Sequence, residues 1–161
     1  VMAAVADTSS IILLAKVGQL RLLQQLHGQV FVPPAVAAEL RAKPDAASQV
    51  VEAFIESPGC VRSPENRLLV QALSADLAAG EAEAIALAAE VPGALLIMDD
   101  AEGRRVARGL NLHMTGLLGV LIEGKGRGLI SAISPLLDQL MAEGFWLSEA
   151  MRRIVLDAAG E

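Results

Sequence analysis

Aromatic side chains are scarce in this chain of 161 residues, which holds three Phe, one Trp and no Tyr. Proteins that bind RNA by stacking its bases need several exposed aromatic side chains. The composition therefore excludes an aromatic platform for RNA. Basic residues are also outnumbered, with 13 Lys and Arg against 19 Asp and Glu, and the formal net charge is −6. Such a charge argues against nonspecific coating of nucleic acid, but it allows an enzyme that grips one phosphodiester.

Cysteine and long apolar runs are missing as well. The single cysteine, Cys60, cannot form an internal disulfide and has no CxxC partner or neighbouring His, so we expect a buried structural thiol. Hydrophobic residues make up 53% of the chain, yet no run approaches the length of about 18 that crosses a membrane. The first residues lack the basic segment and cleavage site of a secretory signal, so we expect a cytoplasmic protein without a membrane partner.

Short apolar strands alternate with helical patterns along the chain, which predicts an α/β domain with a mostly parallel sheet and helices on both faces. Residues 1–6 read as a strand that ends at Asp7, with a polar turn at 8–10. Further strands are predicted at 30–32, 60–61, 94–98 and 111–115, and helices at 20–26, 34–40, 46–56, 66–73, 80–89, from 103, 116–121, 130–140 and 146–158, with a glycine loop at 124–128. We divide the chain into a catalytic domain, 1–128, and a helical extension, 129–161, packed on the same domain.

Acidic residues occur at comparable places in several of these elements. Asp7 and the pair Asp99-Asp100 follow predicted strands, and Glu39 lies in the first turns of a helix after a third strand. Glu81 and Glu83 begin another helix. Taken singly, each acid has an ordinary explanation as a helix cap or as part of a solvated helix face. Together they would converge beyond the carboxyl ends of the strands and repel one another unless a cation lay between them.

Five segments of the chain form a recognisable set of motifs. They are Val5-Ala6-Asp7-Thr8-Ser9, Val32-Pro33-Pro34 with Glu39, the helix from Gly80-Glu81-Ala82-Glu83 to Ala88, the run from Leu96 through Asp99-Asp100 and Gly103-Arg104-Arg105 to Ala107, and Thr115-Gly116-Leu117-Leu118-Gly119-Val120. Together these motifs resemble PIN-domain proteins, and more narrowly their prokaryotic VapC-like ribonuclease branch. The resemblance implies a PIN-like three-layer α/β/α fold with a central, mostly parallel sheet and added C-terminal helices.

The resemblance also implies a metal-dependent endoribonuclease, a toxin of a toxin-antitoxin pair or a relative of one, which uses Mg²⁺ or Mn²⁺. Asp7, Glu39, a third acid in the Gly80-Glu81 helix and a fourth at Asp99 or Asp100 would hold the metal. We favour Glu81 over Glu83 as the third acid, and we regard Asp99 and Asp100 as nearly equal candidates for the fourth. Ser9 would supply the small hydroxyl that the family places beside the first acid. A homodimer and a cognate antitoxin are the implied protein partners, and RNA is the implied substrate.

Arginine residues follow the Asp99-Asp100 pair directly and are the candidate contacts to the substrate phosphate. Arg104 and Arg105 are the nearest, and guanidinium groups suit bidentate contacts with phosphate. Consecutive residues of a helix cannot all face one site, so a solvated face is the competing interpretation. Phosphodiester hydrolysis with a divalent metal needs no His base, which fits a chain with two histidines, His27 and His113.

Two other functions compete with the ribonuclease. A catalytically inactive PIN-like module would act only through protein contacts. A phosphatase or receiver-like domain would use Asp7 as a phosphoryl acceptor, but Ser9 stands where a haloacid-type phosphatase needs a second Asp. High apolar content with few aromatic residues also predicts an exposed hydrophobic patch, which commonly marks a protein interface.

Overall fold

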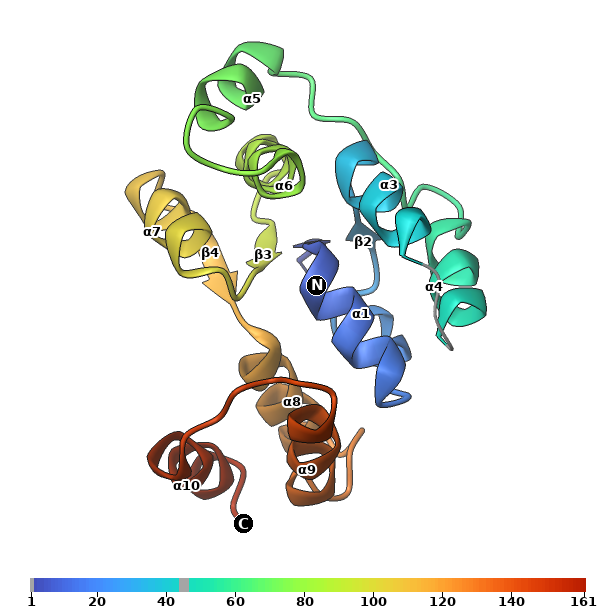
Figure 1. The fold of residues 1–161 in the computed structure, drawn as a ribbon, viewed down its shortest axis with the longest axis vertical. Helices are drawn as coiled ribbons and strands as arrows, with labels where there is room; N and C mark the ends of the chain where they lie inside the picture. Colours follow the sequence, from blue (N-terminus) through green and yellow to red (C-terminus); the bar gives the residue numbers. More distant parts are fainter. Residues whose placement is uncertain (1, 44–46) are drawn as a thin grey trace.

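A parallel four-stranded sheet forms the centre of the computed structural model, which describes residues 2–43 and 47–161 (Figure 1). The strands run in the order β2-β1-β3-β4, and Ala4 lies between Val30 on one side and Leu95 on the other. Their bounds are β1 (Ala4–Ala6), β2 (Val30–Phe31), β3 (Leu95–Ile97) and β4 (His113–Thr115). Beyond β2, a single parallel bridge joins Val32 to Val61 at the place where an edge strand was predicted.

Ten helices flank this sheet in the described part of the chain. Several of them begin at a side chain that caps their first turn. Among the described residues, none of the helices has the length and apolar character that crossing a membrane requires. Their bounds are α1 (Thr8–Lys16), α2 (Arg21–His27), α3 (Pro34–Ala42), α4 (Ser48–Ile55), α5 (Arg67–Leu73), α6 (Ala79–Glu90), α7 (Ala101–Gly109), α8 (Leu117–Gly126), α9 (Ser134–Ala142) and α10 (Glu149–Ala158).

The two faces of the sheet pack against different helices because side chains alternate along each strand. Ala4, Ala6 and Ile97 belong to a core that includes buried residues of α1, α2 and α8. Val5 and Leu96 face the other way and pack with residues of α6 and α7. The predicted PIN-like three-layer α/β/α arrangement is therefore confirmed.

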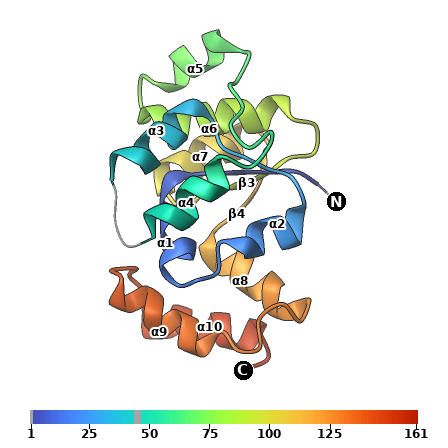
Figure 2. The same cartoon turned by 90° about the vertical axis from the view of Figure 1, so that its right-hand side faces the viewer.

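The C-terminal helices α9 and α10 lie at one end of the molecule, opposite α5 (Figures 1 and 2). Ile133, Leu137 and Leu140 are fully buried and share the core of α1, α2 and α8. Arg152 of α10 binds α9 through Asp138, at 3.0 Å, and the hydroxyl of Ser134. These contacts support an extension packed on the rest of the chain, while its boundary at residue 129 stays a prediction.

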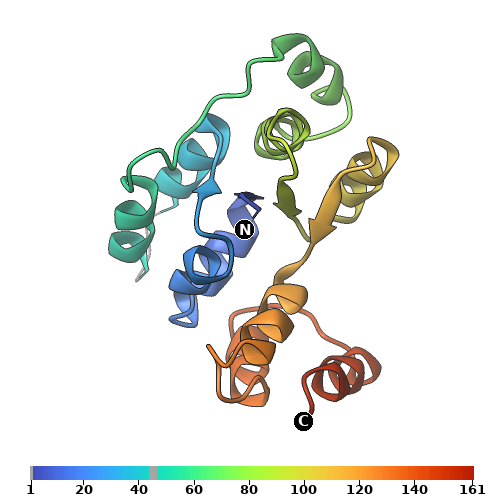
Figure 3. The ribbon, with the colours of Figure 1, turned by 180° about the vertical axis from the view of Figure 1, so that it is seen from behind.

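Two of the predicted local structures are wrong. The polar turn at 8–10 is the first turn of α1, because the Asp7 side chain caps that turn and the apolar face of α1 is buried. The expected glycine loop begins later, since Gly124 and Gly126 belong to α8, which continues from β4 (Figure 3). Gly124 is buried where α8 meets α2, and a Cβ there would lie 2.9 Å from side-chain atoms of Leu22 and Ile130. Close helix packing explains this glycine.

Most other boundaries agree to within a few residues. The helix predicted from 103 begins at Ala101, and those predicted at 130–140 and 146–158 begin at Ser134 and Glu149. Residue 46, the predicted start of one helix, lies outside the described residues. Helix ends commonly differ from sequence-based prediction by a turn because capping decides them.

Candidate active site

The carboxyl ends of β1 and β3 form the edge at which the candidate acids gather. The strand order changes direction at β1, since the chain passes from β1 to β2 on one side and later adds β3 on the other. Open α/β sheets bind ligands at such a switch point. Asp7 directly follows β1, and Asp99 lies two residues after β3.

A cavity of about 340 Å³ opens at this edge. Its wall contains the carboxylates of Asp7, Glu39, Glu81 and Asp100, which come from four different segments of the chain. Ser9 and Lys43 also line it. The fold thus brings together acids that are up to 93 residues apart in the sequence, from Asp7 to Asp100.

Asp7 is the most deeply buried of these acids, with 5% of its surface exposed. It is the N-cap of α1, and its Oδ1 accepts a hydrogen bond from the backbone N–H of Ser10 at 3.0 Å. Burial raises the pKa of Asp7, and the charge of Asp99 adds to the rise. Asp7 therefore caps α1, as the ordinary explanation of this acid expects, and it also lies on the wall of the cavity.

Glu39 is held at the cavity by Thr8 and by the absence of a side chain at Gly80. The Thr8 hydroxyl donates to Glu39 Oε2 at 2.9 Å. A Cβ on Gly80 would clash with Glu39 Oε1 and lie 3.1 Å from its Cδ. The Glu39 carboxylate can therefore lie against the start of α6 because residue 80 has no side chain.

Glu81 and Glu83 are separated by the packing of α6. Glu81 lines the cavity and accepts a hydrogen bond from the backbone N–H of Ala78 at 3.0 Å. Burial raises the pKa of Glu81, and the charges of Asp100 and Glu39 raise it further. Glu83 instead caps the N-terminus of α3 through Ala35 N–H, at 3.1 Å, and pairs with Arg67. The geometry favours Glu81 as the third acid of the site.

Asp99 and Asp100 have different neighbours. Asp100 is the N-cap of α7, accepts from Gly103 N–H at 2.7 Å and lines the cavity. Both oxygens of Asp99 accept from the N–H of Leu117 at the start of α8, at 3.2 and 3.1 Å. Burial raises the pKa of Asp99, while the Leu117 N–H and the charge of Arg104 oppose that rise. Asp99 also lies close enough to Asp7 for its charge to raise the pKa of Asp7, so both acids of the pair stay candidates.

Ser10 is a hydroxyl at the site that the sequence did not single out. It is fully buried, and within the described part of the chain its Oγ has no partner of ordinary hydrogen-bond geometry, although it lies close enough to lower the pKa of both Asp7 and Asp99. Ser9, the predicted hydroxyl, is exposed on the cavity wall. The signal for Ser10 was its place three residues after a helix cap, which only a predicted α1 would have revealed.

The two predicted arginines point to different places. Arg104 is half-buried, donates to the carbonyl of Met98 at 2.9 Å and lies beside Asp99. Arg105 is exposed and pairs with Glu102 on the outer face of α7. One residue of helix turns a side chain by about 100°, so Arg104 alone of the two faces the acids.

The donor set suits a hard divalent cation. Carboxylate oxygens are the preferred protein ligands of Mg²⁺ and Mn²⁺, and each carboxylate here has lone pairs left beyond its capping bond. The unpartnered Ser10 Oγ adds a further buried oxygen between two of the acids. In residues 2–43 and 47–161, no three acidic, His or Cys side chains meet closely enough to form a ready-made metal site. The acids line the same cavity, but their carboxylates are spread along its wall and do not meet in one close group.

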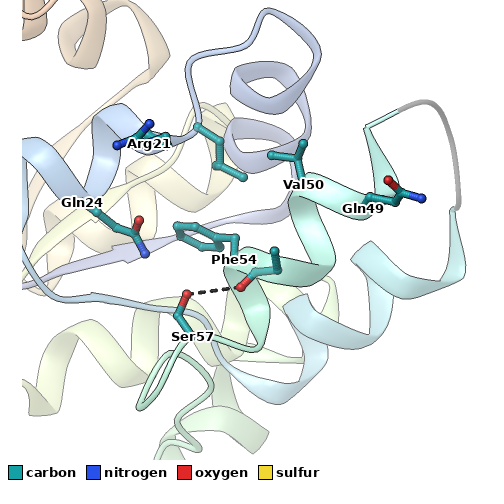
Figure 4. Close-up of a pocket in the computed structure, with 8 residues that line it drawn as sticks. Arg21, Gln24, Gln49, Val50, Phe54 and Ser57 are labelled. Carbon is teal, nitrogen blue, oxygen red and sulfur yellow. Dashed lines mark hydrogen bonds between the residues drawn. The ribbon is translucent and has the colours of Figure 1, made fainter.

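A second cavity, of about 410 Å³, lies between α2 and α4, away from these acids (Figure 4). Leu20, Val50 and Phe54 form its apolar part, and Arg21 and Gln24 lie at its edge. Ser57 is occupied by a hydrogen bond to the carbonyl of Ala53 at 3.3 Å. The pocket holds no group of acids and so has no part in the chemistry considered for the sheet edge.

Comparison with known proteins identifies the family to which the chain belongs. A search of curated proteins finds no match to the chain. A family model described as PIN domain matches residues 3–161, which is nearly the whole sequence. The chain therefore belongs to the PIN-domain family, whose members are generally nucleases that commonly use divalent metal ions.

Proposed function

We propose that the protein is a metal-dependent endoribonuclease that hydrolyses RNA phosphodiesters with Mg²⁺ or Mn²⁺. The observation that carries the proposal is the set of carboxylates from four segments on one cavity wall at the switch point of the sheet. Burial and mutual repulsion raise the pKa values of Asp7 and Glu81. A divalent cation among these acids would relieve the repulsion.

The residues of the chain have separable tasks in this scheme. Asp7, Glu39, Glu81 and Asp99 or Asp100 would hold the cation, with Thr8 fixing the orientation of Glu39. Arg104 would offset negative charge near Asp99. When bound, the cation supplies Lewis acidity toward the phosphodiester and eases the loss of a proton from water.

The Asp7→Asn variant tests the proposal, because asparagine caps a helix as well as aspartate does. The fold should therefore survive while a charged ligand is lost. We expect the purified chain to cleave single-stranded RNA with Mg²⁺ or Mn²⁺ and the variant to lose that cleavage. Asp157→Asn, an exposed Asp on α10, is the matched control. Equal cleavage by wild type and Asp7→Asn, or none by wild type on several RNAs, would refute the assignment.

We also propose that the chain is a toxin of the VapC-like branch, or a relative, that acts in the cytoplasm as a homodimer with a cognate antitoxin. Large apolar side chains on the surface support protein contacts, since Leu68, Trp146 and Ile154 are at least 60% exposed. Sedimentation tests the dimer, and a monomer at micromolar concentration would contradict it. Copurification with the product of a neighbouring reading frame tests the antitoxin.

An inactive PIN-like interaction module is the second candidate. It is favoured by the structural bonds that occupy Asp7, Glu81, Asp99 and Asp100, because those bonds explain the acids without a metal. A melting temperature that does not respond to Mn²⁺ would support this module. A rise with Mn²⁺ that Asp7→Asn abolishes would support the nuclease.

A further inference from the structure

Two basic residues at the end of α3 point in different directions. Arg41 turns toward α4, and its Nε donates to both carboxylate oxygens of Glu52 at 3.1 and 3.2 Å. Lys43, the C-cap of α3, lines the acidic cavity instead. The pair therefore places one cation beside the candidate active site and one away from it.

Lys43 follows Glu39 by four residues, at the end of α3, and both residues line the acidic cavity. Lys43 also lines a small adjoining space with residues that include Ile12, Leu40 and Ser48, and none of the residues described there carries a negative charge. Lysine commonly lays its hydrocarbon stem along apolar surface and keeps its charged end in water. The ion pairs among the described residues leave Lys43 without an acidic partner.

We propose that Lys43 binds an RNA phosphate next to the one that is cleaved, an inference that rests on the proposed function. A nucleic-acid backbone that enters a cavity walled by Asp7, Glu39, Glu81 and Asp100 meets strong repulsion, in a chain whose net charge is −6. A cation at the rim offsets that repulsion and positions the strand. Lysine suits this task because its ammonium binds phosphate as a point charge without a fixed orientation.

A competing role for Lys43 is to neutralise the neighbouring acids. The two roles differ in what removing the charge does. If Lys43 binds phosphate, its loss removes one ionic contact to RNA and leaves the affinity for Mn²⁺ little changed. If Lys43 only neutralises acids, its loss tightens Mn²⁺ binding and leaves the ionic contacts to RNA unchanged.

The salt dependence of RNA binding separates these roles. The probe is a short fluorescein-labelled single-stranded RNA of mixed sequence, titrated in EDTA with the full chain between about 50 and about 200 mM salt. Each phosphate contact to a single strand contributes about 0.7 to the slope of log affinity against log salt. We expect Lys43→Gln to lower the slope by about 0.7, Lys43→Arg to retain it, and Arg41→Gln to leave it unchanged. Melting temperatures should be alike, since Lys43 is exposed.

Four outcomes would each overturn the assignment. They are an unchanged slope in Lys43→Gln, an equal fall of the slope in Arg41→Gln, tighter Mn²⁺ binding by Lys43→Gln, and no RNA binding by wild type. Cleavage assays on the same proteins keep the two proposals distinct. If wild type binds RNA with the Lys43-dependent slope but cleaves none with Mg²⁺ or Mn²⁺, the nuclease proposal fails, and Lys43 remains a contact to an RNA phosphate without a cleaved neighbour. If wild type cleaves RNA and the slope does not change in Lys43→Gln, the Lys43 proposal fails and the nuclease proposal stands.

Discussion

Replacing Gly80 with alanine should impair the candidate site without unfolding the protein. Gly80 is the second residue of α6, and an added Cβ would clash with Glu39 Oε1 while staying 3.4 Å from Val36 Cγ2. The clashing atom is the end of a flexible side chain, so Glu39 can rotate away at little cost. Rotation breaks the hydrogen bond from Thr8 and moves the carboxylate from its position on the cavity wall.

The expected change in stability is small because two terms oppose each other. Alanine in place of glycine stabilises a helix by about 0.5 to 1 kcal/mol. Loss of the Thr8–Glu39 bond costs about 1.5 kcal/mol, the lower end for a bond to a charged group, because Glu39 is half-buried and regains water. The net loss is below about 1 kcal/mol, which corresponds to a fall in melting temperature of less than about 4 °C.

The expected change in metal binding is larger. Losing the support of a ligand typically weakens metal affinity about 10- to 100-fold. A tenfold loss removes about 1.4 kcal/mol of the stabilisation by excess Mn²⁺ and shrinks the Mn²⁺-induced rise in melting temperature by about 3 to 6 °C.

Differential scanning fluorimetry with and without Mn²⁺, together with RNA cleavage, measures both effects. Gly109→Ala is the matched control, because Gly109 ends α7 and a Cβ there meets no atom within 4 Å. It should keep the full response to Mn²⁺ and full cleavage. A Gly80→Ala variant that responds to Mn²⁺ and cleaves RNA like wild type would refute the reasoning, since the position of Glu39 would then be irrelevant.

Two further predictions concern the core. His27 is buried between Glu123 and Arg127, and burial lowers its pKa, so the unfolded chain takes up a proton first as the pH falls. The free energy of unfolding should therefore decrease as the pH falls below about 6.5. His27→Leu should flatten that dependence in urea titrations, and no flattening would mean that His27 binds protons equally in the folded and unfolded states. Gly124→Ala should destabilise the protein by about 1 to 3 kcal/mol through overpacking against Leu22 and Ile130. Gly126→Ala should leave the stability unchanged, because an added Cβ at residue 126 meets no described atom within 4 Å. Leu22→Val should partly restore the stability of Gly124→Ala. Equal losses of stability in the two glycine variants would exclude the packing explanation.

The sequence was sufficient for features that depend on neighbours along the chain. Apolar runs that end in acids located β1 and β3, and the small-residue pattern after Gly80 located α6. Alternation of strands and helices then implied a parallel sheet, whose carboxyl edge must collect Asp7 and the Asp99-Asp100 pair. Period and order are local properties, so they can be read without coordinates. Helix α1 was not predicted, because Thr8-Ser9-Ser10 is as typical of a loop turn as of the first turn of a helix.

Tertiary packing decided which member of each neighbouring pair faces the site. Glu81 lines the cavity while Glu83 caps α3, Arg104 lies by Asp99 while Arg105 pairs outward, and Lys43 faces the acids while Arg41 turns to α4. A helix turns about 100° per residue, so neighbours in sequence point to different surroundings. The packing of α3, α6 and α7 on the rest of the fold sets those directions, and it is long-range: the place of the Glu39 carboxylate depends on the absence of a Cβ at Gly80, 41 residues further along the chain.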